Sequence, residues 1–183
     1  LGTVLTVTRQ NGILPNPAVY QVLDKLINLF RSIPFIILLF CLLPLTRLLV
    51  GTAIGVRGAI VPLMFGTTPF FARQIEASLW EVDPGLVEAA QAMGNSDFEI
   101  ILHVYWRESI AGIARGTTIT LISLIGLTAM AGAVGAGGLG NYADIYGQQR
   151  NRMDTIYVTV VILVLMVSVI QIIGNTIAKR NTH

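Results

Sequence analysis

The sequence predicts an all-α membrane protein, a polytopic helical bundle with four full spans and the end of a further span at its start. Of the 183 residues, 54% are hydrophobic and only 12% are charged, whereas charged residues make up about 25% of a typical soluble domain. The mean hydropathy is +0.71. Four stretches are each long enough to cross roughly 30 Å of hydrocarbon, which takes about 20 mainly apolar residues. We therefore expect residues 1–183 to form a single transmembrane domain.

The first residues are typical of the last part of a span. The stretch from Leu1 to Thr8 is mainly apolar and stops at Arg9, and it is too short to cross a bilayer. A charged region, an apolar core and a cleavage site do not follow one another here, so a signal peptide is not indicated. We expect residues 1–9 to be the end of a truncated first span.

The next segment predicts an amphipathic helix. Asn16 and Pro17 suit the cap and the first position of a helix, and apolar residues then recur at helical spacing from Val19 to Phe30. Such a helix is expected to lie on the membrane surface or to lead into the next span.

Two spans that contain prolines follow, over residues 31–51 and 59–80. The first holds the run IPFIILLFCLLPL, whose two prolines should kink it. In the second, Pro62 and Pro69 are expected to interrupt the hydrogen-bond ladder of the helix.

Arg73 and Glu76 stand three residues apart near the end of the second of these spans. At this spacing the two side chains can pair along one face of a helix. Two interpretations remain open: the helix end protrudes from the lipid on the cytoplasmic side, or the pair has a role inside the membrane.

The last two spans are predicted over residues 110–136 and 155–173. The first is rich in Gly, Ala, Ser and Thr, which let helix backbones approach closely. The second ends before Lys179 and Arg180. Placing this basic end in the cytoplasm, with an odd number of spans in the intact protein, puts six basic residues inside and four outside, which favours this orientation.

The loop between the second and third full spans, residues 81–109, predicts a helical hairpin. Asp83 and the proline after it are suited to start a helix. Gly94 is suited to end it, because a residue just past a helix end often adopts the left-handed conformation that costs glycine least. Ser96 and Glu99 match the capping box of a second helix. The unit is therefore expected to be helix, tight turn, helix.

Small residues on the first helix of this hairpin, Ala89, Ala90 and Ala92, would offer a shallow surface that another chain can approach. A re-entrant or surface hairpin without a special function is the alternative. For the second helix, Phe98, Ile101 and Leu102 are predicted to anchor the hairpin to the spans, because they line one helical face.

The hairpin sequence resembles a known motif. Glu88-Ala89-Ala90, three residues, Gly94, nine residues and Val104 are similar to the EAA motif, E-A-A-x3-G-x9-I-x-L-P, of ABC-importer permeases. Trp106 and Arg107 stand where that motif has Leu and Pro. The exit from the second helix is therefore expected to be continuous rather than broken.

The resemblance extends over nearly the whole chain. The stretches VGAGGLG, ARQIEASLWEVDPGLVEAAQAMG and TTITLISLIGLTAMAGAVG resemble the methionine-import (MetI-type) permease family of ABC importers. This resemblance implies a bundle of the type I ABC-importer permease kind, with five spans, the amino terminus outside and the carboxyl terminus inside. It also implies that the hairpin is the coupling helix, with Glu88, Ala89, Ala90 and Gly94 as the ATPase-coupling residues.

The same resemblance implies the assembly and its place in the cell. It predicts an ATP-driven importer of D- and L-methionine in the bacterial inner membrane, in which two copies of the permease bind two copies of an ABC ATPase. An extracytoplasmic methionine-binding lipoprotein would deliver the substrate. The permease itself would be no enzyme and would hold no cofactor.

Other motifs in the sequence do not indicate a different activity. Gly135, Gly137 and Gly140 satisfy the dinucleotide fingerprint G-x-G-x-x-G, but they follow a span and not a strand, so we expect no nucleotide site. The sequence has no P-loop motif, which places ATP hydrolysis on a partner. His103 and His183 are too far apart to suggest a metal or catalytic site. A net charge of +2 with scattered basic residues excludes nucleic-acid binding.

Met130 stands among alanines and glycines, so its unbranched side chain projects from a stretch of little bulk. It is either a packing residue or a movable plug in the translocation pathway.

Two rival functions are possible for the whole chain. An ATP-independent secondary transporter or channel would need an ion site within the membrane, for which no acidic residue lies in the middle of a span. An intramembrane enzyme would need a nucleophile with a base, or metal ligands, and none converge.

Overall fold

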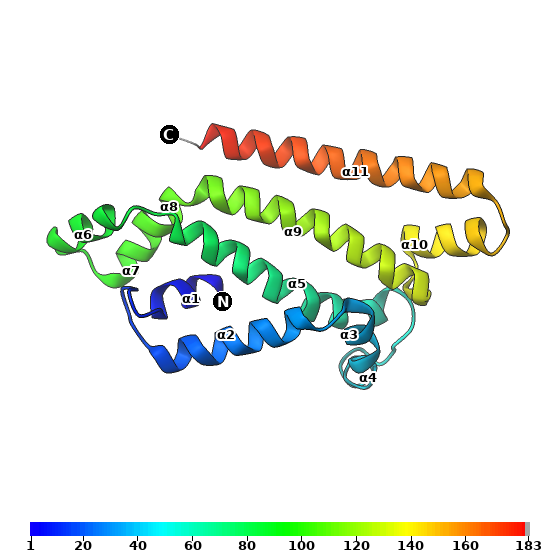
Figure 1. Cartoon of the computed structure of the whole chain (residues 1–183), viewed down its shortest axis with the longest axis horizontal. Coiled ribbons are helices and arrows are strands. Elements are labelled where there is room, and N and C mark those ends of the chain that lie inside the picture. Colours follow the sequence, from blue (N-terminus) through cyan, green and yellow to red (C-terminus); the bar gives the residue numbers. More distant parts are fainter. Residues whose placement is uncertain (182–183) are drawn as a thin grey trace. The chain divides into compact units, whose positions relative to one another are not determined.

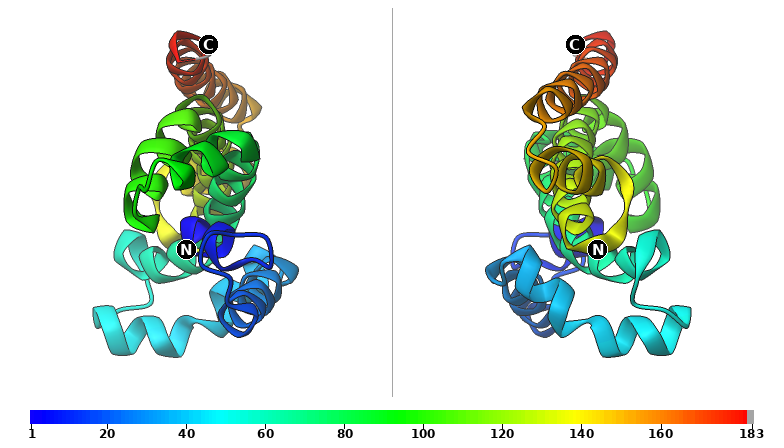
Figure 2. Two further views of the ribbon diagram at one scale, coloured as in Figure 1. Left: turned by 90° about the vertical axis from the view of Figure 1, so that its left-hand side faces the viewer. Right: turned by 90° about the vertical axis from the view of Figure 1, so that its right-hand side faces the viewer.

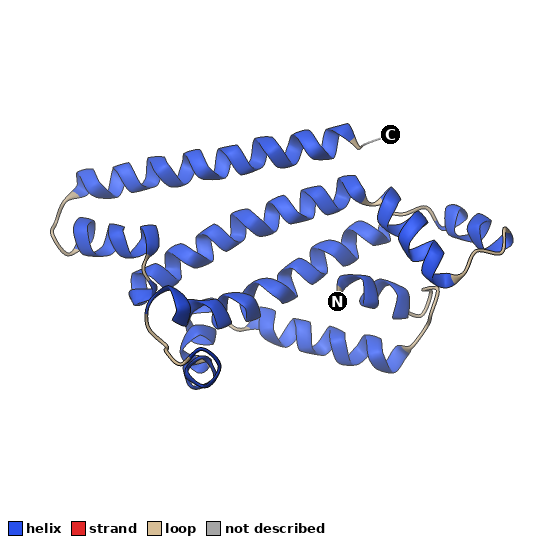
Figure 3. Cartoon of the chain, turned by 180° about the vertical axis from the view of Figure 1, so that it is seen from behind, coloured by secondary structure: helices blue, strands red, loops and turns tan. Residues whose placement is uncertain are grey.

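The computed structural model describes residues 1–181, and within them every regular element is a helix (Figure 3). This confirms the predicted all-α class. His183, for which no metal or catalytic role was predicted, lies outside the described residues.

The helices can be followed along the chain in Figure 1. In order, they are α1 (Gly2–Thr8), α2 (Pro17–Ser32), α3 (Phe35–Cys41), α4 (Leu43–Val50), α5 (Gly55–Trp80), α6 (Pro84–Ala92), α7 (Asp97–Ile100), a π-helical turn (Ile101–Tyr105), α8 (Trp106–Glu108), α9 (Ile110–Ala131), a second π-helical turn (Gly132–Ala136), α10 (Gly138–Tyr142), a third π-helical turn (Ala143–Gln148) and α11 (Met153–Arg180).

The chain forms two compact units. The first contains residues 1–29, residues 69–120 and the chain from Ile173 onward, and the second contains residues 30–68 and 121–172. Helices α5, α9 and α11 each contribute to both units. The predicted hairpin lies wholly within the first unit.

The first unit is built around the contact of α1 and α2 with the second half of α5. Leu5, Ile27 and Ala72, one from each helix, form a buried cluster. Figure 2 shows α1 beside α2, both in blue. The backbone N–H of Val19 donates a hydrogen bond of 3.2 Å to the side-chain oxygen of Asn16, which confirms the predicted cap of α2.

The polar face of α2 is joined to α5 by Arg73. Its guanidinium donates to Glu76 at 2.6 Å, as predicted, and also pairs with Asp24 and donates to Asn28 of α2, the latter at 3.0 Å. Asn28 in turn donates to Asp24 at 3.1 Å. The arginine therefore links two helices in addition to pairing along its own.

The segment 31–51 is interrupted next to both of the prolines that were predicted to kink it, and these interruptions divide it into separate helices rather than one kinked helix. Pro34 lacks an amide hydrogen and restricts the residue before it, so α2 ends at Ser32 and α3 begins at Phe35. Leu42, with φ −88° and ψ −1°, then joins α3 to α4. Gly51 ends α4 in the left-handed conformation, at φ +79°.

The neighbouring segment 59–80 lies within one helix. Helix α5 runs from Gly55 to Trp80, and Pro62 and Pro69, which lack an amide hydrogen, each leave out one bond of its ladder without ending the helix. By length and composition, α9 and α11 are the described helices that could each span a membrane, and α4 with α5 forms a third candidate only as a pair bent by 117°. The break in the segment 31–51 leaves α3 and α4 with 7 and 8 residues, each too short to cross a bilayer alone.

The second unit has its own core. Phe35 and Leu39 of α3 pack with Ala59 of α5 and Ala131 at the end of α9. Beyond Ala131 the chain leaves the α-helical conformation, and Gly135 has a φ of +95°. The predicted span 110–136 is therefore α9 followed by a kink over Gly132–Ala136, in which Val134 and Gly135 have non-helical backbone angles.

Loss of the Arg73 side chain is expected to destabilise the first unit. The variant Arg73→Ala leaves two carboxylates without their cation in a partly buried place, which should lower the free energy of unfolding by about 1–3 kcal/mol. Thermal unfolding of the purified protein would measure this. Arg57→Ala is the matched control, because Arg57 is an exposed residue of the same helix with no ion pair among the described residues. Equal melting temperatures for the two variants would contradict the bridging role.

Candidate functional site

The first helix of the hairpin, α6, has a defined beginning and end. The carboxylate of Asp83 accepts a hydrogen bond of 2.8 Å from the backbone N–H of Gly85, and Pro84 takes the first helical position. Gly94 has a φ of +81°, and its amide donates to the carbonyl of Gln91 at 2.9 Å. A Cβ at Gly94 would meet nothing within 4 Å. Glycine is therefore favoured here by the positive φ of the backbone and not by a lack of space.

The second helical arm begins with the predicted capping box. The amide of Ser96 donates to the carboxylate of Glu99 at 2.8 Å, and the amide of Glu99 donates to the hydroxyl of Ser96 at 3.4 Å. The hydrogen bonds from Ser96 favour the charged carboxylate and lower the pKa of Glu99. The arm then continues without a break through Trp106 and Arg107, as expected from the departure of these residues from the EAA motif.

Burial along this arm corrects the predicted anchors of the hairpin. Ile100 is fully buried, whereas Phe98 is 69% exposed and Leu102 is 45% exposed. Ile101 is half-buried. The π-helical turn over residues 101–105 adds one residue to a helical turn and so rotates the following side chains away from the regular 3.6-residue spacing. Within the described chain the buried contact of this arm is made by Ile100, which precedes that turn.

The base of the hairpin is fixed by a close approach of α5 and α9. The hydroxyl of Ser109 donates to the backbone carbonyl of Ser78 at 3.0 Å in a buried position. A Cβ added to Gly112 would lie 3.0 Å from the Ser78 Cβ, and one added to Gly116 would lie 2.9 Å from the Gln74 Cβ. Glycine at both positions therefore lets the two helices pack closely.

Sequence reasoning missed this contact as the support of the hairpin. The available signal was the pair Gly112 and Gly116, which stand four residues apart on one face of α9. Their partners on α5 are recognisable only once the two helices are placed together.

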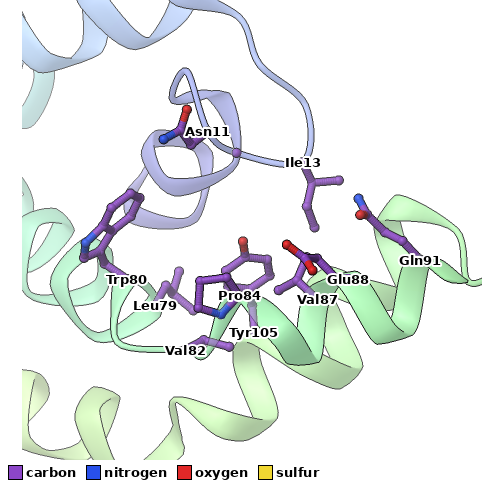
Figure 4. Close-up of a pocket in the computed structure, with 11 residues that line it drawn as sticks. Asn11, Ile13, Leu79, Trp80, Val82, Pro84, Val87, Glu88, Gln91 and Tyr105 are labelled. Carbon is purple, nitrogen blue, oxygen red and sulfur yellow. The ribbon is translucent and has the colours of Figure 1, made fainter.

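The motif residues of α6 lie in different surroundings. Ala90 is buried, and Ala89 and Glu88 are exposed. The structure gives the carboxylate of Glu88 no ion pair or hydrogen bond within residues 1–181. It lines a cavity of about 500 Å³ between α6 and the loop that follows α1 (Figure 4).

The hairpin also carries large apolar side chains that the chain does not cover. Met93 is 74% exposed, and Phe98, Leu102 and Trp106 are exposed as well. We refer to these four residues as the hairpin patch. Exposed apolar surface of this kind marks sites of interaction with another molecule.

Met130 is 46% exposed on α9. Its neighbours Ala129 and Ala131 line a separate apolar cavity of about 190 Å³ in the second unit, together with residues of α5 and the stretch 136–140, and Met130 does not line it. A role of Met130 in a translocation pathway remains a prediction.

Comparison with known proteins defines the class of protein. Residues 2–182 match the family described as "Binding-protein-dependent transport system inner membrane component", and the chain belongs to this family. It is therefore a component of a transport system of the inner membrane.

Particular members of the family are similar over the whole chain. The "Probable D-methionine transport system permease protein MetI" of Vibrio cholerae is 45% identical over 183 residues, which are 100% of this chain and 81% of the relative. The protein of the same description from Pasteurella multocida is 46% identical and is covered to 84%. A solved structure titled "Inward facing conformations of the MetNI methionine ABC transporter" matches with a TM-score of 0.96 and 44% identity, over 100% of this chain and 84% of that one.

Acid is expected to loosen the start of the second arm. Because the pKa of Glu99 is lowered from its ordinary 4.5 in the folded protein, its contribution to stability is complete above that ordinary value and is lost as the pH falls through the folded-state pKa. Hydrogen-exchange protection of amides 96–100 should therefore decrease between about pH 6 and about pH 3. In Glu99→Gln the side chain cannot ionise, so protection should lack this step. Constant wild-type protection across the range would contradict the role given to Glu99.

Proposed function

We propose that the chain is the membrane-spanning permease subunit of an ATP-driven ABC importer for D- and L-methionine. The proposal rests on the hairpin. It has the EAA-like residues, the exposed hairpin patch, and the carboxylate of Glu88, which has no partner in the described chain. The substrate is inferred from the likeness to D-methionine permeases over the full length of the chain. ATP would be hydrolysed on a separate ATPase subunit.

The proposed assembly contains two copies of this chain and two copies of the ATPase, with an extracytoplasmic methionine-binding lipoprotein that delivers the substrate. A single copy with four or five spans encloses little space, so two copies are needed to surround a pathway. The solved transporter that this chain resembles is titled a methionine ABC transporter, which supports assembly with an ABC ATPase.

In the proposed orientation the hairpin and the carboxyl terminus lie in the cytoplasm. Lys179 and Arg180 form the last turn of α11, and basic residues at the end of a span favour the cytoplasmic side. The spans would be residues 31–51, 59–80, 110–136 and 155–173, after the end of a first span at residues 1–9. The segment 31–51 would enter the bilayer as the broken set of helices described above.

In the proposed coupling, the hairpin docks in a groove of the ATPase. The hairpin patch would supply apolar contact area, the exposed Ala89 would allow close approach, and Glu88 would pair with a basic or amide group. ATP binding would draw the two hairpins of the dimer together and open the pathway outward, and hydrolysis would return it. The contact of Ser109 with Ser78 would carry this movement from the hairpin to α5 and α9.

Met130 is proposed to line the translocation pathway near the two-fold axis as a movable plug. Its exposure on α9 supports contact with something outside the single chain. An unbranched thioether side chain can change its conformation at low cost.

Changing Gly94 should uncouple ATP hydrolysis from uptake. In Gly94→Val a β-branched residue is forced to a positive φ, which costs about 1–3 kcal/mol and favours a different angle between the two helical arms. Methionine uptake into proteoliposomes should fall on the order of tenfold or more while ATP hydrolysis continues. Gly94→Asn is the matched control, because asparagine tolerates the left-handed conformation better, and it should retain most of the uptake. Normal coupled uptake by Gly94→Val would count against the lever role of the hairpin.

Uptake should require the ATPase. Proteoliposomes that contain this chain with its cognate ATPase should accumulate labelled methionine when ATP and the binding lipoprotein are present, and vesicles with the chain alone should not. Transport by the chain alone would instead favour an ATP-independent secondary transporter or channel.

A further inference from the structure

The apolar cavity of the second unit lies on the side of α9 that faces away from Met130. Four residues near the end of α9 line it, namely Ile125, Thr128, Ala129 and Ala131. At about 100° of rotation per residue of an α-helix, the side chains of Ile125 and Thr128 point about 140° and about 160° away from that of Met130. Met130 therefore projects from the face of the helix opposite to the cavity.

The facing wall of the cavity comes mainly from α5 and is also apolar. It consists of Val56, Ala59, Ile60 and Leu63. None of the described residues that line the cavity carries a charge, and all of them belong to the second unit. The volume is about 190 Å³, whereas protein interiors contain few voids larger than a water molecule. The two helices can therefore come closer here without burying a charged group.

Two glycines join the end of α9 to α10 (Figure 1). A Cβ added to Gly140 would lie 2.0 Å from the carbonyl oxygen of Ala129, and one added to Gly132 would lie 2.7 Å from the carbonyl oxygen of Gly137. Contacts as close as these exclude a side chain at either glycine. The end of α9 and the helix α10 are therefore expected to move as one piece.

The two ends of α9 are held differently. Near its start, Gly112 and Gly116 lie directly against α5, which fixes that end. Near its other end, the cavity is lined by both helices. Beyond Ala131 the backbone is not helical at Val134 and Gly135, so no rigid extension of α9 holds this end in place. The end of α9 has room to move toward α5.

We propose that this cavity is the space into which the end of α9 moves when the translocation pathway opens outward. The proposal rests on the proposed function, because it uses the placement of Met130 in the pathway, and it adds the direction of the movement and the room for it. Ala129 and Ala131 close onto Ile60 of α5, and α10 moves with them. Met130 withdraws from the pathway in the same step, because it stands on the opposite face of α9.

The first test fills the cavity from α5. In Ile60→Trp the indole occupies the space that α9 needs, so methionine uptake with the cognate ATPase should fall on the order of tenfold. Met64→Trp is the matched control, because Met64 lies one turn further along α5, is also exposed and does not line the cavity. It should transport as the wild type does. Equal uptake by the two variants would overturn the proposal.

The second test fills the cavity from α9 in steps. Uptake should decrease in the order wild type, Ala129→Val and Ala129→Leu, as the added side chain takes up more of the cavity. The melting temperature should not decrease with it, because the resting protein has space for these side chains. A melting temperature that falls in parallel with uptake would overturn the proposal, since it would show that the cavity cannot hold the added atoms.

The third test measures the approach of the two helices directly. Ile60→Cys and Ala129→Cys are combined with Cys41→Ser, which removes the one native cysteine. A short thiol-to-thiol cross-linker should join the pair faster in the complex with the ATPase trapped by a non-hydrolysable ATP analogue than in the nucleotide-free complex. Each single cysteine variant gives the background. A rate that stays the same or falls with the analogue would overturn the proposal.

Failure of this inference can be told apart from failure of the proposed function. A wild-type chain that takes up no methionine with its cognate ATPase would contradict the proposed function itself. Normal uptake by the wild type, together with normal uptake by Ile60→Trp and Ala129→Leu, would leave the proposed function intact and overturn the role of the cavity alone.

Discussion

The close approach of α5 and α9 at the base of the hairpin fixes the position of the hairpin. Hydrocarbon tails are as apolar as leucine side chains, so spans associate through tight packing and hydrogen bonds rather than through the hydrophobic effect. Gly112 and Gly116 remove the side chains that would separate the two helices, and the buried bond from Ser109 to Ser78 closes the contact. The chain leaves α5 and returns into α9 across this contact. Both arms of the hairpin therefore start from one fixed base.

The charged groups of the first unit divide into two kinds. Arg73 is committed to Asp24 and Glu76, and Arg9 is stacked on Trp80. These cations hold elements of the chain to one another. Glu88, in contrast, sits in a cavity without a partner among the described residues. Because an isolated carboxylate is stabilised by a nearby cation, the fold leaves this position ready for a group from another molecule.

Sequence reasoning was most successful where the structure depends on neighbours along the chain. The caps at Asn16 and Asp83, the capping box of Ser96 with Glu99 and the turn at Gly94 are each decided by a few adjacent residues. These features together defined the hairpin and its candidate residues. The pairing of Arg73 with Glu76 was predictable for the same reason.

Features that depend on distant residues or on a change of helical period were not predictable in this way. In the second arm Ile100 is the buried residue and Phe98 and Leu102 lie on the outside, and the π-helical turn that begins at Ile101 changes the period only for the side chains that follow it. The segment 31–51 is apolar enough for one helix, but the local geometry around Pro34 and Leu42 divides it. The cavity beside Glu88 needs the loop after α1, which lies some seventy positions earlier in the sequence.

The glycines beyond the end of α9 set a condition on what surrounds them. Gly135, Gly137 and Gly138 all have positive φ values, so the peptide groups there cannot all be satisfied by a regular ladder of hydrogen bonds. Hydrocarbon offers no substitute donors or acceptors, and irregular backbone at that depth is tolerated only against protein or water. Wherever the acyl chains of the bilayer reach, this stretch must be shielded from them by protein or water.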